Sequence, residues 1–208
     1  MMLCLVTDRR RRPPIEQARE AALAGIDLIH IRERDLETRD LASLVAGVVA
    51  ATRGSATRVV VNDRVDVAIA CGADGVHLRE DSTPAIRVRE AAPEGFLIGC
   101  SVHSPGGAAA AARGADYLVA GTVFPTTSKP GLTGLLGLDG LSAVATAVQA
   151  PVLAIGGVSL ARVADVAAAG AGGVAAIGLF ADPDLPIKEV VRQIQERFNI
   201  GGGFLPRT

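Results

Sequence analysis

Aromatic residues are scarce in this chain of 208 residues, which has no tryptophan, one tyrosine and five phenylalanines. Proteins that bind single-stranded nucleic acid stack the bases on aromatic side chains, so this composition argues against such a surface. Charge of one sign is also lacking, because 21 basic and 22 acidic residues give a formal net charge of −1. No global field favours a nucleic acid or a membrane, and we expect neither as a partner.

Cysteines and long hydrophobic runs are few as well. Cys4, Cys71 and Cys100 are far apart and show no metal-ligand spacing, which indicates a reduced, cytoplasmic chain. No segment reaches the roughly 18 uninterrupted apolar residues of a membrane span. The apolar run from Met1 to Val6 precedes the basic run from Arg9 to Arg12, and a secretory signal has the opposite order.

What the sequence does contain is a repeated alternation of short apolar runs and alanine-rich stretches. Hydrophobic residues make up 49% of the chain, which excludes intrinsic disorder and fits one domain with a sizeable core. Runs rich in Val, Ile and Leu with little alternation predict strands buried on both faces. These runs are Leu3–Thr7, Leu28–Arg32, Arg58–Asn62, Gly75–Leu78, Leu97–Ser101, Tyr117–Ala120, Pro151–Ile155 and Gly173–Ile177.

A helix is predicted after each of these strands. The candidates are Ile15–Ala24, Asp40–Ala51, Val65–Cys71, Pro84–Ala92, Gly106–Arg113, Leu138–Val148, Leu160–Ala168 and Pro186–Phe198. Eight strand–helix units favour a single (β/α)8 TIM barrel with eight parallel strands, spanning residues 1–200. The alternative is an open doubly wound sheet, but no glycine-rich dinucleotide loop follows the first strand. Residues 201–208 begin with three glycines and are predicted to form a flexible tail.

A short triplet recurs before every second predicted strand. Each triplet starts with a glycine, which can form the left-handed cap of the preceding helix. All four triplets occur at the same point of the strand–helix repeat, and this regularity supports the barrel. They are Gly25-Ile26-Asp27, Gly72-Ala73-Asp74, Gly114-Ala115-Asp116 and Gly170-Ala171-Gly172.

Barrel chemistry lies at the carboxyl ends of the strands, and the second predicted strand ends there in arginines. Alternation places His30, Arg32 and Arg34 on one side of the chain. Two guanidinium groups aimed at one mouth predict an anionic ligand, because the planar fork pairs with phosphate or carboxylate. The alternative is ion pairing with nearby carboxylates, namely Glu33, Asp35 and Asp63.

Single polar residues follow the next strands. Asp63, after Asn62, can cap the next helix or bind Mg²⁺, which takes one or two carboxylates together with water and phosphate. His77 lies within a strand and is expected to be a neutral histidine bonded inside the barrel. Ser101 and His103 end the fifth strand, but no Ser–His–Asp order indicates a hydrolase.

The loops after the last three strands carry groups suited to phosphate. Thr126, Ser128 and Lys129 give a polar, cationic loop, for which the alternative is a merely exposed loop. Gly157 and Gly178 allow backbone N–H groups to approach an anion, and these loops form the usual phosphate site of a barrel. Together with the arginines, they predict two phosphorylated small molecules in one mouth. No general base or metal triad is evident, which fits a reaction whose leaving group is pyrophosphate.

As a set, these residues resemble the thiamine phosphate synthase/TenI superfamily over nearly the whole chain. The matching segments are Leu5-Val6-Thr7-Asp8, His30 to Asp35, Asn62 to Asp66, Gly72 to Leu78, Gly99 to His103, Gly114 to Tyr117, Gly121 to Lys129, and Ala154 to Val158. The resemblance implies a transferase of thiamine biosynthesis. It would join hydroxymethylpyrimidine pyrophosphate to thiazole phosphate with release of pyrophosphate.

The resemblance also implies a role for each matching position. The thiazole phosphate would contact Thr126, Ser128, Gly157, Ile177 and Gly178. The pyrimidine and its pyrophosphate would contact His30, Arg32, Arg34, Asn62, Ser101 and Lys129, with Arg32 and Lys129 catalytic. Mg²⁺ would bind positions matching Asp63 and Ser82, and Asp81 can replace the carboxylate that Ser82 lacks.

Several positions differ from the family pattern and keep other functions open. His30 stands where the synthase usually has Gln, Arg34 where it has Lys, and Arg79 where a small Gly is usual. The alternative is a TenI-type thiazole tautomerase, an isomerase without a metal, but its catalytic histidine falls at Thr122. A further alternative is a non-catalytic regulator that binds thiazole or thiamine phosphate. The sequence is compatible with a homo-oligomer.

Overall fold

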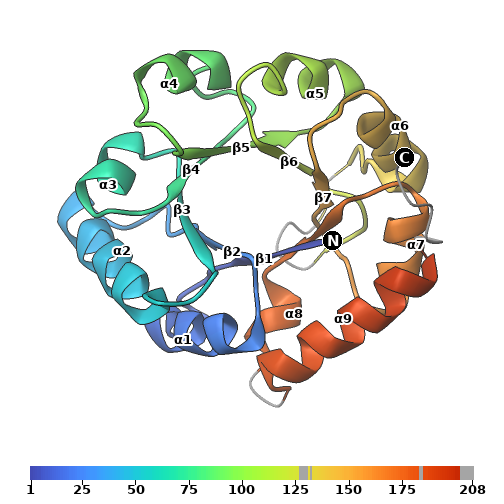
Figure 1. The fold of residues 1–208 in the computed structure, drawn as a ribbon. Coiled ribbons are helices and arrows are strands. Elements are labelled where there is room, and N and C mark those ends of the chain that lie inside the picture. Colours follow the sequence, from blue (N-terminus) through green and yellow to red (C-terminus); the bar gives the residue numbers. More distant parts are fainter. Residues whose placement is uncertain (127–130, 132, 183–184, 202–208) are drawn as a thin grey trace.

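Eight parallel strands close into one barrel in the order of the sequence, as predicted (Figure 1). The structure is a computed structural model that describes residues 1–126, 131, 133–182 and 185–201. The strands are β1 (Met2–Val6), β2 (Leu28–Ile31), β3 (Arg58–Asn62), β4 (Gly75–Leu78), β5 (Leu97–Val102), β6 (Tyr117–Ala120), β7 (Val152–Ala154) and β8 (Gly173–Ala176). Each predicted strand is present within two residues at either end.

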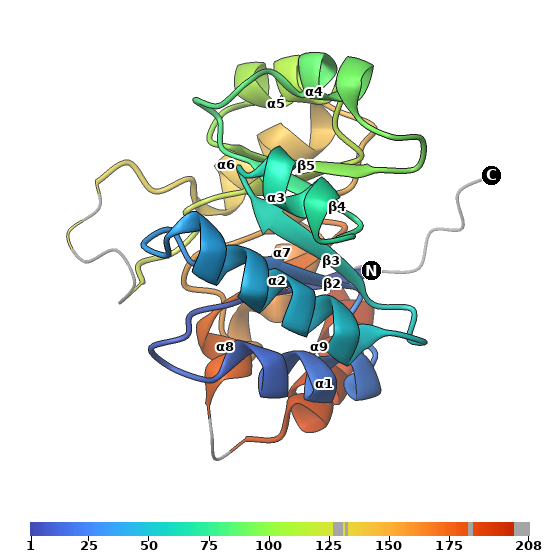
Figure 2. The same cartoon turned by 90° about the vertical axis from the view of Figure 1, so that its left-hand side faces the viewer.

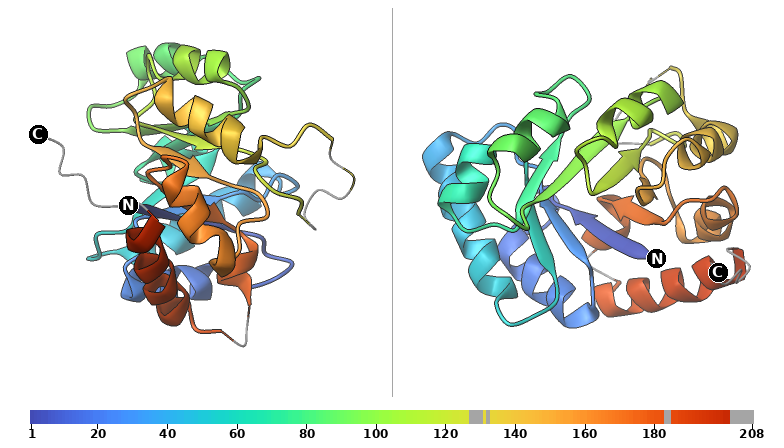
Figure 3. Two further views of the ribbon diagram at one scale, coloured as in Figure 1. Left: turned by 90° about the vertical axis from the view of Figure 1, so that its right-hand side faces the viewer. Right: turned by 45° about the horizontal axis from the view of Figure 1, so that its top comes forward.

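The helices form a ring around the barrel (Figures 1 and 3). They are α1 (Pro14–Ala24), α2 (Thr38–Thr52), α3 (Val65–Ala70), α4 (Ala85–Ala91), α5 (Pro105–Ala111), α6 (Gly137–Thr146), η1 (Leu160–Arg162) with α7 (Val163–Ala168), and α9 (Ile187–Gly201). Helix α9 packs against α7 and α1 and so closes the ring. The sequence missed α8 (Gly178–Ala181), a single turn after β8. None of the described helices is long and apolar enough to cross a membrane.

The recurring triplets fasten neighbouring strands at the amino-terminal end of the barrel. The carboxylate of Asp27, before β2, accepts a hydrogen bond of 2.7 Å from the backbone N–H of Leu3 in β1. Asp74 and Asp116 accept bonds of the same length from β3 and β5, at the N–H groups of Val59 and Ile98. The triplet aspartates are therefore structural, and they lie at the end of the barrel opposite the predicted ligand site.

Alternate residues of every strand point into the barrel. Leu28, Val60, Val119 and Leu153 are among the buried interior side chains, while the opposite faces pack on the helices. The interior changes from apolar to polar toward the carboxyl ends of the strands, where His30, Asn62, His77 and Ser101 take the inward positions. The described part of the β6–α6 loop projects from this end, and the N-terminus lies at the other end (Figure 2).

Candidate active site

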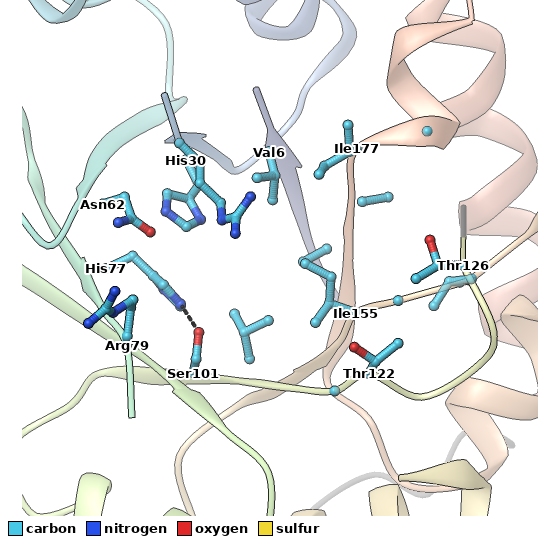
Figure 4. Close-up of a pocket in the computed structure, with 18 of the residues that line it drawn as sticks. Val6, His30, Asn62, His77, Arg79, Ser101, Thr122, Thr126, Ile155 and Ile177 are labelled. Carbon is cyan, nitrogen blue, oxygen red and sulfur yellow. Dashed lines mark hydrogen bonds between the residues drawn. The ribbon is translucent and has the colours of Figure 1, made fainter. Parts of the chain in front are cut away.

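A cavity of about 690 Å³ opens at the carboxyl ends of the strands. It collects residues from all eight strand–helix units. The predicted residues that line it are His30, Arg32, Arg34, Asn62, Asp81, Ser101, Thr126, Gly157, Ile177 and Gly178. Ser128 and Lys129 lie outside the described residues. Figure 4 shows two sides, with His30, Asn62, His77, Arg79 and Ser101 facing Thr122, Thr126, Ile155 and Ile177.

The arginines after β2 keep their charge available to a ligand. The carboxylates that could have neutralised them bind Arg9 instead, at 3.1 Å for Glu33 and 2.6 Å for Asp35. Within the described part of the chain, no carboxylate oxygen lies within 4.0 Å of the guanidinium nitrogens of Arg32 or Arg34. Burial and then the charge of Arg34 lower the pKa of Arg32. This excess positive charge in a cavity favours an anion.

Asp63 and Asp81, the two predicted magnesium ligands, converge on Arg79. The guanidinium Nε of Arg79 lies 3.1 Å from Asp63 and 3.0 Å from Asp81. This Nε makes no well-aligned hydrogen bond to either carboxylate, but Nη2 of Arg79 donates a hydrogen bond of 3.1 Å to Asp81. A ligand that displaces the guanidinium must therefore replace this bond as well as the charge contacts. Asp63 also accepts hydrogen bonds from the hydroxyl of Ser82 at 2.5 Å and from the backbone N–H of Arg79 at 3.0 Å.

The backbone at Asp63 is left-handed, with φ of 58°. This conformation is uncommon for a residue other than glycine and costs free energy. It turns the carboxylate toward the end of β4 and away from α3, whose N-cap residue, Arg64, makes no side-chain capping bond. Asp63 is therefore not a helix cap, and the cavity edge is the place where its carboxylate is held.

The donors at this edge fit Mg²⁺. Two carboxylates and the hydroxyl of Ser82 are hard oxygen ligands, and the carboxylates already share one cationic neighbour. Among the described residues, no group of three His, Cys, Asp or Glu side chains could hold a metal alone. Mg²⁺ commonly takes its remaining ligands from water and substrate phosphate. Binding it here requires the guanidinium of Arg79 to give way.

His30 presents an unpartnered polar atom to the cavity. The residue is 5% exposed, and its Nε2 has no hydrogen-bond partner among the residues that the structure describes. Burial is the main cause that lowers the pKa of His30 well below its usual value, followed by the charges of His77 and Arg32. The hydrogen bond that His30 makes to Asn62 acts in the opposite direction. The ring is therefore neutral and can hydrogen-bond a polar ligand group.

Backbone hydrogen bonds join the loops after β6 and β7. The N–H of Val123 donates to the carbonyl of Ile155 at 2.9 Å, and the N–H of Phe124 donates to the carbonyl of Gly156 at 3.0 Å. At Gly157, φ is 63° and a Cβ would lie 2.8 Å from the carbonyl oxygen of Phe124. Only glycine fits this contact without movement, which brings Thr126 and the bare backbone of Gly157 to the same cavity wall.

Arg11 also lines the cavity, although its place in the sequence did not predict a site role. A Cβ built on Gly178 would lie 3.4 Å from Nη1 of Arg11, so its guanidinium lies beside the start of α8. The basic run directly after β1, at the carboxyl end of a strand, was the available signal. Arg11 adds positive charge to the wall formed by Thr126, Gly157 and Ile177.

Comparisons with known proteins agree with this geometry. A family model described as thiamine monophosphate synthase matches residues 3–180. The chain belongs to that family. It is 46% identical over 179 residues to the thiamine-phosphate synthase of Methanoculleus marisnigri, which covers 84% of this chain and 85% of the relative. It is 35% identical over 199 residues to the thiamine-phosphate synthase of Chlorobium phaeovibrioides, covering 94% and 95% of the two chains.

Solved structures show the same family and fold. Thiamine phosphate pyrophosphorylase from Pyrococcus furiosus superimposes with a TM-score of 0.84 at 36% identity, covering 94% of this chain and 96% of that one. The 3-hexulose-6-phosphate synthase of Salmonella typhimurium superimposes with a TM-score of 0.72 at 17% identity, covering 97% and 100% of the two chains. That second likeness concerns the barrel alone. The resemblance of the chain to the thiamine monophosphate synthase family is thus confirmed.

Proposed function

We propose that this protein is a thiamine-phosphate synthase that joins hydroxymethylpyrimidine pyrophosphate to thiazole phosphate. One observation carries the proposal: a single cavity has two separate sets of anion-binding groups. Arg32 and Arg34 lie free of carboxylates on one side, and Thr126, Gly157 and Arg11 lie on the other. Two phosphorylated substrates can bind there with their uncharged rings between the two sets. Relatives of similar length carry the same name.

The reaction requires one bond to break and one to form. The C–O bond between the pyrimidine methylene and pyrophosphate breaks, and pyrophosphate leaves with the electron pair. The thiazole nitrogen then donates its lone pair to the methylene carbon and forms the C–N bond. Negative charge grows on the leaving group, so the guanidinium groups of Arg32 and Arg34 stabilise the transition state more than the bound substrate. Lys129 is proposed to act beside Arg32 on the same leaving group.

The remaining side chains orient the two rings. We propose that neutral His30 and Asn62 hydrogen-bond the pyrimidine, which fits the unpartnered Nε2 of His30. Ile177 and Gly178, with Ser128, are proposed to complete the thiazole phosphate site. Asp63 and Asp81 would hold Mg²⁺, which would supply positive charge to offset the charge of pyrophosphate.

The test is to incubate the protein with both substrates and to measure thiamine phosphate and pyrophosphate. We expect the two products in equal amounts, and loss of activity when Mg²⁺ is chelated. Asp63→Asn is expected to need more Mg²⁺, whereas Asp66→Asn, which alters only an exposed ion pair with Arg64, serves as the matched control. No thiamine phosphate from the wild-type protein with both substrates and Mg²⁺ would contradict the proposal.

One observation keeps the thiazole tautomerase as a second candidate. Nδ1 of His103 hydrogen-bonds the carbonyl of Gly121, next to Thr122, where the tautomerase has its histidine. The imidazole of His103 is half exposed, and its Nε2 lies 4.0 Å from Glu80. A tautomerase would lose its activity in His103→Gln and keep it without Mg²⁺. Synthase activity, in contrast, should survive His103→Gln.

A further inference from the structure

Tyr117, the single tyrosine of the chain, lies inside the barrel below the cavity. Its side chain is 1% exposed, and its hydroxyl lies 3.2 Å from Nδ1 of His77. On the other side of the same ring, Nε2 of His77 lies 3.0 Å from the hydroxyl of Ser101, which lines the cavity (Figure 4). A chain of three polar groups thus runs from the closed interior to the ligand site.

The barrel is built to allow this chain. In the strand register, Gly99 of β5 pairs with His77 of β4 on one side and with Tyr117 of β6 on the other. A Cβ on Gly99 would lie 2.6 Å from Nδ1 of His77 and would overlap the end of the Tyr117 ring. The missing side chain therefore leaves the space through which tyrosine reaches histidine across an intervening strand.

Only one arrangement of protons satisfies every buried donor. A neutral imidazole donates from one nitrogen and accepts at the other. If Nδ1 donated to Tyr117, the buried phenol proton would have no acceptor, because the hydroxyl of Tyr117 has no other partner in the described structure. If Tyr117 donates to Nδ1, then Nε2 donates to Ser101, and each group is satisfied. Buried polar groups rarely stay unpaired.

This arrangement fixes the role of Ser101. Its oxygen accepts from His77, so its own proton is left to point into the cavity. His77 and Tyr117 are only 2% and 1% exposed, and such burial keeps both rings neutral. Doubly protonated imidazole and phenolate are both disfavoured at neutral pH.

We propose that Tyr117 and His77 are positioning residues that hold the hydroxyl of Ser101 as an obligatory hydrogen-bond donor to the pyrophosphate group of the substrate. The identity of the ligand in this inference rests on the proposed function. The arrangement of protons among Tyr117, His77 and Ser101 does not depend on it. A donor fixed in place before the reaction stabilises the charge that develops on a leaving group. Without the hydroxyl of Tyr117, His77 can also adopt the tautomer that is protonated at Nδ1. The hydroxyl of Ser101 then donates its proton to Nε2 of His77 and is no longer available to the ligand.

The first measurement is the ¹⁵N spectrum of the imidazole nitrogens in the wild-type protein at neutral pH. We expect His77 to be protonated at Nε2 and unprotonated at Nδ1, and this result does not depend on any catalytic activity. Protonation at Nδ1 would overturn the proposal. Tyr117→Phe removes a single oxygen atom, and it is expected to give His77 a mixture of both tautomers.

The second measurement is a double-mutant cycle read by calorimetric binding of inorganic pyrophosphate. Ser101→Ala should weaken binding about 10-fold, as expected for one hydrogen bond to a charged group. Tyr117→Phe should weaken it by a smaller factor, and it should have no further effect in the Ser101→Ala background. The exposed Ser43→Ala in α2 is the control and should bind normally. Equal effects of Tyr117→Phe in both backgrounds, or no binding of pyrophosphate at all, would contradict the role given to Ser101.

These results separate the inference from the proposed function. A protein that binds pyrophosphate through Ser101 but forms no thiamine phosphate would keep the inference and reject the synthase. A protein that forms thiamine phosphate, but in which the effects of Ser101→Ala and Tyr117→Phe on pyrophosphate binding are additive, would keep the synthase and reject the inference. For the active enzyme, we expect Ser101→Ala and Tyr117→Phe to lower kcat more than they change the KM for thiazole phosphate.

Discussion

His30 and His77 are adjacent buried histidines, with ring centroids 4.5 Å apart in the polar layer of the barrel interior. Burial is the largest cause that lowers the pKa of each ring. Two cationic imidazoles at this distance, close to Arg32, would repel one another in a medium of low dielectric constant. The pair therefore acts as neutral hydrogen-bonding groups and supplies no charge to the ligand.

The first prediction concerns acid stability. Because the pKa of His77 falls from 6.5 in the unfolded chain to about 4 in the folded protein, the unfolded state binds more protons between these values. Stability should then decrease as pH falls from 6.5 to 4, by about 3 kcal/mol for this group at 1.36 kcal/mol per pKa unit. Urea unfolding at several pH values measures it.

A variant that lacks the buried imidazole tests this prediction. His77→Gln should lessen the slope of stability against pH in this window relative to the wild type. The ion-paired carboxylates Asp35 and Asp66, with pKa values of about 2, lose their contribution at lower pH, between about 4 and 2. Equal slopes for the wild type and His77→Gln would contradict a neutral buried His77.

The second prediction concerns Arg79, whose guanidinium lies between Asp63 and Asp81. Arg79→Ala frees both carboxylates, so the Mg²⁺ concentration that gives half-maximal activity should decrease. The exposed Arg87→Ala on α4, which breaks only a surface pair with Glu90, is the matched control. A Mg²⁺ requirement that is unchanged in Arg79→Ala would show that this arginine does not compete with the metal.

For single residues, the sequence predicted which side chains line the cavity better than it predicted which side chains they contact. Arg32, Asn62 and Ser101 follow from alternation and from their places at strand ends. The pairing of Arg9 with Glu33 joins residues of two different units, and the contact of His77 with Tyr117 crosses a third strand. Local pattern carries no information about such contacts, because they depend on the register of the closed barrel.

The secondary-structure elements were predicted closely because their physical signal is strong. Strands covered on both faces read as continuous apolar runs, and each lies between clear helix and turn signals. Helix α8 was missed, since four residues, Gly178–Ala181, are too few to show a helical period. The loops between elements, which carry much of the site, have no period at all, and their positions follow from contacts such as those between the β6–α6 and β7–η1 loops.

The third prediction tests that loop contact. Gly157→Ala places a Cβ against the carbonyls of Phe124 and Pro125, so it should destabilise the protein and weaken binding of thiazole phosphate. Gly54→Ala is the matched control: its φ of 83° is also left-handed, but nothing lies within 4 Å of the added Cβ. Both variants bear a backbone cost of about 1 kcal/mol, and Gly157→Ala should lose about 1 to 3 kcal/mol more.

Urea unfolding and calorimetric binding of thiazole phosphate measure the two effects. Gly54→Ala should bind this ligand like the wild type, because it lies in the loop after α2, far from the cavity lining. Identical stability and binding in the two variants would show that the close contact of the two loops is not needed for the phosphate site.

The whole molecule is a closed barrel in which one end holds the strands together and the other end carries the cavity. At the amino-terminal end, Asp27, Asp74 and Asp116 hydrogen-bond to neighbouring strands. At the other end, units from both halves of the sequence meet in one cavity, with β2–β5 on one side and β6–β8 on the other (Figure 4). The repeat in the sequence predicted this closure, and closure in turn brings the two proposed anion-binding sets to opposite sides of one cavity.

The central claim is that the two substrates bind to opposite sides of the cavity. The measurement that tests it most directly is the effect of one variant from each side on the KM of each substrate. Arg32→Ala should raise the KM for the pyrimidine pyrophosphate by about 10-fold or more, as expected for lost hydrogen bonds to a charged group. It should leave the KM for thiazole phosphate nearly unchanged. Thr126→Val should give the opposite pattern. If both variants raised the KM for the same substrate, the assignment of two phosphorylated substrates to opposite sides of the cavity would be wrong.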